Sequence, residues 1–148
     1  MNNHLKLEFP SLPQNVGLTR LVVATFASQL EFTLAEIEEI RVAVSEAVSN
    51  CVIHAYPKNP GLVEVVLEIE DGALSISVTD FGKGIEDVEM AKQATFSTEP
   101  ERMGLGLVFM ESFMDEMSLN SQPQKGTSVK MKKRPERGIA DARISGNC

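Results

Sequence analysis

The chain has 148 residues, of which 43% are hydrophobic and 24% charged, and its formal net charge is −7. This length suits one domain with a proper core, and the negative charge argues against binding a nucleic-acid backbone. No apolar stretch is long enough to span a membrane, and the first residues lack the pattern of a secretory signal. The two cysteines, Cys51 within a predicted helix and Cys148 at the last residue, make no disulfide framework. We therefore expect a reduced, cytoplasmic setting.

The first third of the chain is predicted to be one strand and two helices. Apolar and polar residues alternate over residues 5–9, as in a half-buried strand, and two prolines then end the pattern. Over residues 16–30 an apolar stripe recurs at helical spacing: Leu18, Leu21, Val22, Thr25 and Phe26. Thr33 and Glu36 have the spacing of a capping box, and the helix that they open is expected to run to about Ala55.

A hairpin follows over residues 63–78, with alternating apolar residues in both strands and a tight turn at Asp71-Gly72. The stretch from residue 81 to 103 is irregular, with one short helix expected near residues 87–93. Residues 107–117 favour a helix, followed by a short strand near Leu119, a turn over residues 122–126 and a last strand over residues 127–133.

These elements predict a two-layer α/β (α+β) sandwich, in which a mixed sheet carries helices on one face. Residues 1–134 are expected to form a single domain, and residues 135–148 a disordered tail.

Glu46 and Asn50 interrupt a helix that is apolar almost all the way round, and their i, i+4 spacing places both side chains on one face. Polar groups in such a place cost several kcal/mol, roughly, unless something satisfies them. An internal hydrogen-bonded pair is one explanation. The other is a site in which the Asn50 amide oxygen binds Mg²⁺ and Glu46 takes a proton from an attacking hydroxyl or water.

Asp80 has the same strand parity as the apolar residues Ile76 and Val78, which points its carboxylate into the core. A bound adenine satisfies such a carboxylate, because its exocyclic amine donates a hydrogen bond. Gly82 and Gly84 let the backbone turn sharply and approach a flat ring closely. The alternative is an aspartate that caps a turn just past the strand end.

Gly104 and Gly106 are predicted to lie just before a helix, whose first amides favour a phosphate group. They follow a polar stretch, residues 93–103, that fits a lid closing over a triphosphate. Arg102, at the end of that stretch, either stabilises the charge of a transferred phosphoryl group or is an ordinary surface charge. Thr127 is equally compatible with a hydroxyl near the adenine and with a β-branched strand residue.

In this order, these segments resemble the nucleotide-binding boxes of the GHKL (Bergerat-fold) ATPase and kinase superfamily. The whole span from about residue 5 to 133 resembles, within it, the small bacterial anti-sigma factors that are also serine protein kinases. The resemblance rests on four stretches: SEAVSNCVIHAY (residues 45–56), VTDFGKGI (78–85), GLGLVFMESFMDEM (104–117) and KGTSV (125–129).

The resemblance implies binding of ATP or ADP with Mg²⁺, with Glu46 as catalytic base, Asn50 as Mg²⁺ ligand, Asp80 as the carboxylate that reads adenine and Arg102 as a lid arginine. It also implies a homodimer that holds a sporulation sigma factor of the sigma F type in the ATP state, and that phosphorylates a small anti-anti-sigma antagonist on serine. Arg20, facing outward from the first helix, matches a position that the family uses to grip sigma.

Two departures from the family pattern fall in the lid: it is about two residues short, with Glu99 in place of a lysine, and Met103 precedes Gly104 where a small residue is usual. Two alternatives stay open. One is an anti-sigma kinase of the general stress-response type. The other is a detached histidine-kinase-like module, for which a histidine-bearing helix pair would be expected upstream, whereas only His4 precedes the first helix.

Overall fold

The computed structural model describes residues 1–85 and 98–136, and for residues 98–103 the backbone alone. Its elements in chain order are β1 (Asn3–Pro10), α1 (Gln14–Ala27), α2 (Leu34–Asn50), a π-helical turn η1 (Cys51–Ala55), β2 (Leu62–Glu70), β3 (Ala73–Asp80), α4 (Thr98–Phe113), β4 (Glu116–Gln122) and β5 (Gly126–Lys133). The short helix predicted near residues 87–93 lies outside the described residues.

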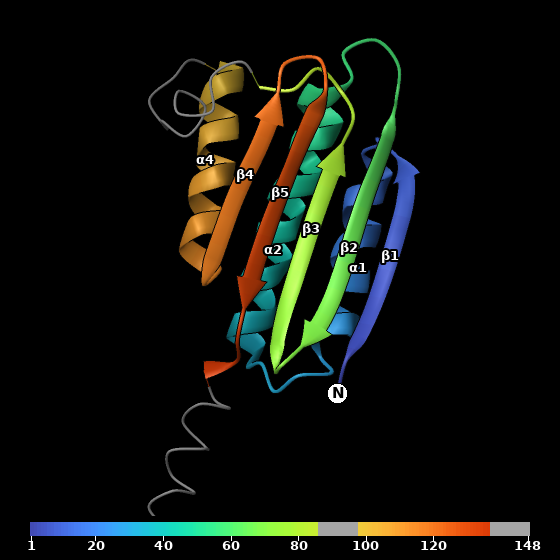
Figure 1. The fold of residues 1–148 in the computed structure, drawn as a ribbon. Coiled ribbons are helices and arrows are strands. Elements are labelled where there is room, and N and C mark those ends of the chain that lie inside the picture. The colour runs from blue at the N-terminus through green and yellow to red at the C-terminus, as the bar shows by residue number, and fades with distance from the viewer. Residues whose placement is uncertain (86–97, 137–148) are drawn as a thin grey trace, which may run out of the picture.

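The five strands form one sheet in the order β1-β2-β3-β5-β4, with α1, α2 and α4 packed on one face (Figure 1). The two-layer prediction is therefore confirmed. All four pairings are antiparallel, so the predicted mixed sheet is wrong. The reason is that α4 leads into the edge strand β4, and the hairpin then returns β5 antiparallel between β4 and β3.

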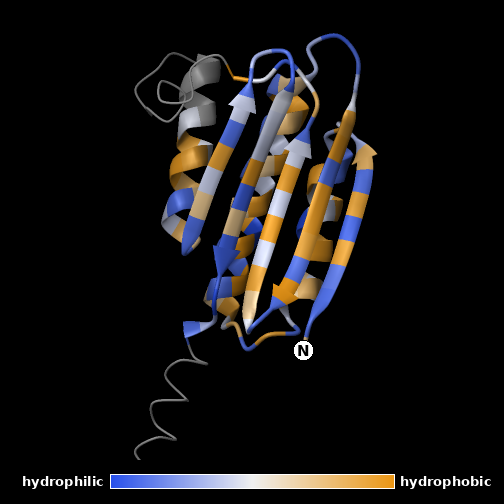
Figure 2. Cartoon of the chain, viewed as in Figure 1, coloured by the Kyte–Doolittle hydropathy of each residue, from blue (hydrophilic) through white to orange (hydrophobic). Residues whose placement is uncertain are grey.

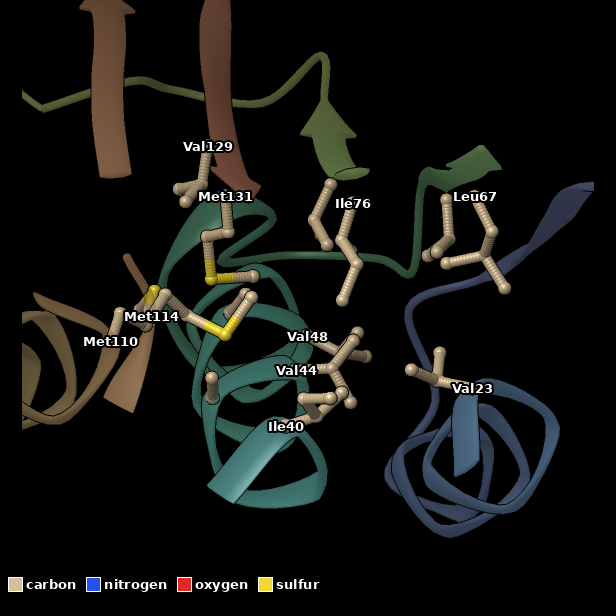
Figure 3. Close-up of a cluster of buried hydrophobic side chains, with 14 of the residues drawn as sticks. Val23, Ile40, Val44, Val48, Leu67, Ile76, Met110, Met114, Val129 and Met131 are labelled. Atoms are coloured by element: carbon tan, nitrogen blue, oxygen red, sulfur yellow. The ribbon is translucent and has the colours of Figure 1, made fainter. Parts of the chain in front are cut away.

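The core lies between the sheet and the helices. The strands alternate apolar and polar residues (Figure 2), and the apolar ones on β2 and β3 are buried beneath α1 and α2. Val44 and Val48 of α2 point toward Ile76, while Met110 of α4 and Met114, just after it, gather near Met131 of β5 (Figure 3). This packing holds the end of α2 over the end of β3, where the candidate residues lie.

The helix α2 begins with the predicted capping box. Thr33 Oγ1 accepts from the Glu36 amide at 3.1 Å, and Glu36 Oε1 accepts from the Thr33 amide at 2.9 Å. The Glu36 side chain is buried, and its other oxygen accepts from the Glu136 amide at 3.1 Å. The chain just after β5 is therefore tied to the start of α2.

The predicted apolar stripe of α1 is wrong in part. Leu18 and Leu21 are 54% and 64% exposed, and Thr25 is exposed as well. The buried residues of α1 are Thr19, Val23, Phe26 and Ala27. These buried residues form a second stripe along α1, which packs against the rest of the protein. Small residues such as Ala27 allow α1 and α2 to approach closely.

The helix α4 differs from its prediction at both ends. It begins at Thr98, so Gly104 and Gly106 lie inside it instead of before it. It ends at Phe113, whose carbonyl oxygen accepts from Lys133 Nζ at 2.6 Å, and β4 already begins at Glu116. A lysine at this point satisfies a carbonyl that the helix leaves without a partner.

Within the described residues, no helix has both the length and the apolar character needed to cross a bilayer.

Candidate functional site

Asp80 ends β3 with a buried side chain, as its strand parity predicts. Its Oδ1 accepts from the Gly82 amide at 3.0 Å. Burial raises the pKa of Asp80 above its ordinary value, although hydrogen bonds from Gly82, the Cys51 thiol and the Thr127 amide oppose that rise. The carboxylate thus stays in a place where a further donor would stabilise its charged form.

A small cavity lies directly against Asp80. Its volume is about 30 Å³, and it is lined by residues from α2, η1, β3, α4 and β5, among them Asn50, Cys51, His54, Leu107 and Thr127. This volume holds one or two water molecules, far less than a purine ring needs. The cavity is therefore closed, with a mostly apolar lining and a few polar groups, among them Asp80, Asn50 and Thr127.

Burial raises the pKa of the Cys51 thiol well above its usual value, and the neighbouring carboxylate of Asp80 raises it further. Its Sγ lies 3.4 Å from the Ala47 carbonyl oxygen, a second acceptor for the one thiol proton that Asp80 also attracts. Cys51 is consequently a neutral wall of the cavity and not a nucleophile.

The glycines after β3 are required by close backbone packing. A Cβ at Gly82 would lie 2.1 Å from the Ala55 carbonyl oxygen. One at Gly84, where φ is +73°, would lie 2.1 Å from the Gln122 carbonyl oxygen. The approach to a flat ring that we expected of these glycines stays a prediction, because their described neighbours are atoms of Ala55 in η1, of Gln122 at the end of β4 and of Pro123.

The loop after β3 is also hydrogen-bonded on both sides. The Lys83 amide donates to the Ala55 carbonyl at 2.9 Å, and the Gln124 amide donates to the Lys83 carbonyl at 2.6 Å. On the hairpin side, the Ile85 amide donates to Ser121 Oγ at 2.8 Å. These contacts fix the loop that follows Asp80 between η1 and the last hairpin.

Thr127 pairs with Asp80 across β3 and β5, so the two side chains lie next to each other on the same face of the sheet. The Thr127 hydroxyl lies 2.8 Å from Ser121 Oγ. Sequence reasoning singled out Thr127 but missed Ser121. The parity that Ser121 shares with Leu119 on β4 could have indicated it.

Tyr56 was missed as well. Its hydroxyl donates to the Leu62 carbonyl at 2.6 Å and accepts from the Phe81 amide at 2.8 Å. It thereby links the chain after η1 to the start of β2 and to the residue next to Asp80. Only the proximity of Tyr56 to the helix end marked it in the sequence, and that is a weak indication.

Glu46 and Asn50 lie half-buried in the last turns of α2, on the side that faces α4. A Cβ at Gly106 would be 2.9 Å from Glu46 Oε2 and 3.6 Å from Asn50 Nδ2. The structure therefore brings Glu46, Asn50 and Gly106 together, with Asn50 also lining the cavity beside Asp80. The helix N-terminus that we expected at Gly104 and Gly106 to receive phosphate is not present, since both glycines are helical.

Of the two predicted arginines, Arg20 is the one whose side chain the structure describes. The Arg20 Nε donates to Ser45 Oγ at 2.8 Å, so this side chain lies along α2 and does not point straight outward from α1. Arg102 belongs to α4, and its side chain lies outside the described part of the chain.

Asn50 is the residue that fits a role as a Mg²⁺ ligand. In the described ranges, no group of three histidine, cysteine, aspartate or glutamate side chains could hold a metal ion. A single amide oxygen at the edge of the cavity fits a Mg²⁺ that draws its other ligands from nucleotide phosphates and water.

Known proteins that resemble this chain have a nucleotide-binding type of domain, as the site geometry suggests. Residues 9–133 match the family model of the histidine kinase-like ATPase domain, which implies nucleotide binding. The anti-sigma F factor of Caldanaerobacter subterraneus subsp. tengcongensis is 50% identical over 134 residues, 89% of this chain and 94% of that protein. The anti-sigma F factor of Geobacillus sp. strain WCH70 is 44% identical over 136 residues, 90% of this chain and 93% of that protein. This chain belongs to the anti-sigma F factor family.

Solved structures share the fold of this anti-sigma F factor family member. The RsbU and RsbW domains of Rv1364c from Mycobacterium tuberculosis align with a TM-score of 0.66 at 20% identity, over 89% of this chain and 32% of that one. The SiaB-SiaC complex from Pseudomonas aeruginosa aligns with a TM-score of 0.64 at 14% identity, over 86% of this chain and 88% of that one. The predicted GHKL fold is confirmed.

Proposed function

We propose that this protein binds Mg²⁺-ATP, transfers its γ-phosphoryl group to a serine of a small anti-anti-sigma antagonist, and captures a sporulation sigma factor of the sigma F type. The observation that carries the nucleotide site is the buried Asp80 carboxylate beside Thr127 and Asn50 on one cavity. A carboxylate so placed selects a ligand edge that donates a hydrogen bond, as the amine of adenine does.

The chemistry is assigned to Glu46. In this proposal its carboxylate takes the proton of the serine hydroxyl while the serine oxygen bonds to the γ-phosphorus, and ADP leaves with the bridging oxygen. The Mg²⁺ held at Asn50 would neutralise charge on the phosphates. Because Gly106 has no side chain, α4 lies close to Glu46 and limits the positions that the carboxylate can take.

The test compares two glutamine variants on the same helix. Glu46→Gln should keep ADP affinity near wild type while the radiolabelled phosphate transferred to the antagonist falls by roughly 10²–10⁴-fold. Glu38→Gln is the matched control, since Glu38 lies on the exposed side of α2 and pairs with Arg41 at 2.9 Å. Normal transfer by the Glu46 variant would exclude Glu46 as the base.

Asn50→Ala tests the ion separately. It should weaken ATP binding in the presence of Mg²⁺ and leave Mg²⁺-free ADP binding close to wild type. If Mg²⁺ raised the ATP affinity of Asn50→Ala as much as it raises that of the wild type, Asn50 would not be the ligand.

The surface proposed for sigma lies on α1. Leu18 and Leu21 are large exposed apolar residues next to Arg20, and an apolar patch with one basic group is typical of a protein contact. The names of the curated relatives favour a sigma factor of the sporulation type over the general stress-response type. The homodimer implied by the family resemblance belongs to the same proposal.

A further inference from the structure

Ser121 is the centre of a small hydrogen-bond network behind the cavity. Its Oγ accepts from the Ile85 amide at 2.8 Å and donates to the Gly126 carbonyl at 3.1 Å. The Thr127 hydroxyl is the third contact, at 2.8 Å, and Thr127 lines the cavity together with Asp80.

The number of protons available to these contacts decides which hydroxyl donates in the Ser121–Thr127 hydrogen bond. A serine hydroxyl has one proton and two lone pairs. The proton of Ser121 goes to the Gly126 carbonyl, and one lone pair takes the Ile85 amide. For all three contacts to form at once, the Thr127 hydroxyl donates to Ser121, and Thr127 then has only acceptor lone pairs left for the cavity.

The cavity therefore has two acceptors in neighbouring positions, the Asp80 carboxylate and the Thr127 oxygen, which pair across β3 and β5. A 6-amino purine brings N–H groups to such a surface. A 6-keto purine places an oxygen at the same position, and its lone pairs oppose the two acceptors that would face the exocyclic amine; its N1–H donor lies one ring position away.

We propose that Ser121 is a positioning residue for base selection: by accepting the Thr127 proton it keeps Thr127 an acceptor and so excludes 6-keto purine nucleotides. This inference rests on the proposed nucleotide site. It adds to that site the residue that sets its selectivity, although the Ser121 side chain itself is expected to touch no ligand.

The chain offers a matched control on the opposite face of the sheet. Thr79 and Ser128 form a second hydroxyl pair, at 3.1 Å, between the same strands β3 and β5. Ser128→Ala removes a hydroxyl of the same kind from a threonine partner, on the side of the sheet that faces away from the helices.

The experiment measures ADP and inosine diphosphate (IDP) affinities by calorimetry for wild type, Ser121→Ala, Ser121→Thr and Ser128→Ala. In Ser121→Ala the Thr127 proton is released and can donate to a keto oxygen, so the preference for ADP over IDP should narrow about tenfold. Ser121→Thr keeps the hydroxyl and should restore the wild-type ratio, while Ser128→Ala should leave it unchanged. A loss of the Ile85 contact alone would weaken both nucleotides together and leave the ratio constant.

An unchanged ratio in folded Ser121→Ala overturns the inference and leaves the proposed function standing. If Ser121→Ala does not fold, Thr127→Val decides: it removes the acceptor at the cavity and should narrow the ratio, and a full wild-type preference in that variant overturns the inference. Failure of the wild-type protein to bind ADP overturns the proposed function, and the inference with it.

Discussion

Gly106 of α4 packs directly against Glu46 of α2, so closely that a Cβ at residue 106 would come within 2.9 Å of Glu46 Oε2. Glycine inside a helix costs about 1 kcal/mol relative to alanine, so the helix tolerates Gly106 at some expense of stability. The contact gives a reason for it: the space that a methyl group would fill is occupied by the carboxylate of the proposed base.

Gly106→Ala should separate stability from activity. The added methyl group would crowd the flexible end of Glu46 and make ordinary contacts with Glu46 Cβ and Asn50 Nδ2, at 3.5 and 3.6 Å. The free energy of unfolding should therefore stay constant or rise by up to about 1 kcal/mol. The displaced Glu46 should lower phosphoryl transfer by roughly 10- to 100-fold. Gly17→Ala in α1 is the control, because a Cβ there meets nothing within 4 Å. Urea unfolding and a transfer assay on both variants measure the two effects, and full activity of Gly106→Ala would contradict the proposed contact.

Asp80→Asn should make the nucleotide-free protein more stable at neutral pH. Burial raises the pKa of Asp80 in the folded state above 3.8, its ordinary value. The protein therefore has its full free energy of unfolding below pH 3.8, where Asp80 is neutral in both states. Part of that free energy is lost as the pH rises through the raised pKa of the folded state, because the buried side chain then becomes charged. Thermal unfolding should therefore favour the asparagine variant at about pH 7 and show no difference at about pH 3.

The same variant should bind ADP more weakly, by about 1.5–3 kcal/mol, because it loses a charge-assisted hydrogen bond. Calorimetry gives this value directly. Undiminished ADP affinity would remove Asp80 from the base site, whatever the stability result.

Tyr56→Phe should reduce both stability and ADP affinity. The change removes the hydroxyl that joins the Leu62 carbonyl to the Phe81 amide, at an expected cost of about 1–2 kcal/mol in unfolding free energy. ADP affinity should fall because Phe81 follows Asp80. Gly61→Ala tests the same link from the other side, since its Cβ would lie 2.3 Å from the Tyr56 ring. Two variants with wild-type ADP affinity would show that Tyr56 does not position the loop.

Arg20→Glu should abolish capture of the sigma factor in a pull-down and leave ATP affinity unchanged. The Arg20 guanidinium is held by Ser45, so Ser45→Ala should weaken capture by a smaller factor through loss of orientation. Retained capture by Arg20→Glu would exclude this part of α1 as the docking surface.

Local periodicity was enough to predict Asp80 and the Glu46–Asn50 pair. Strand alternation decides which way Asp80 points, and helical spacing decides that Glu46 and Asn50 share a face. Both rules act over a few residues, and the structure agrees with them.

Features that depend on distant contacts were predicted less well. Two apolar stripes run along α1, and only packing against α2 decides that Val23 is buried and Leu21 exposed. The direction of β5 depends on its pairing with β3, which no local pattern encodes. In the sequence, Gly104 and Gly106 resemble a break before a helix, yet both lie inside α4. The close approach of α2 and α4 explains why residue 106 is a glycine.

The closed shape of the cavity has a kinetic consequence. Leu107 and Ile85 line the space beside Asp80, and Leu107 is 1% exposed, so under the proposed function a base enters only after these side chains move. At high nucleotide concentration the observed association rate should then level off at the rate of opening instead of rising without limit. The apparent affinity also contains the fraction of molecules that are open, so a partner that favours the open form would tighten nucleotide binding without touching the nucleotide.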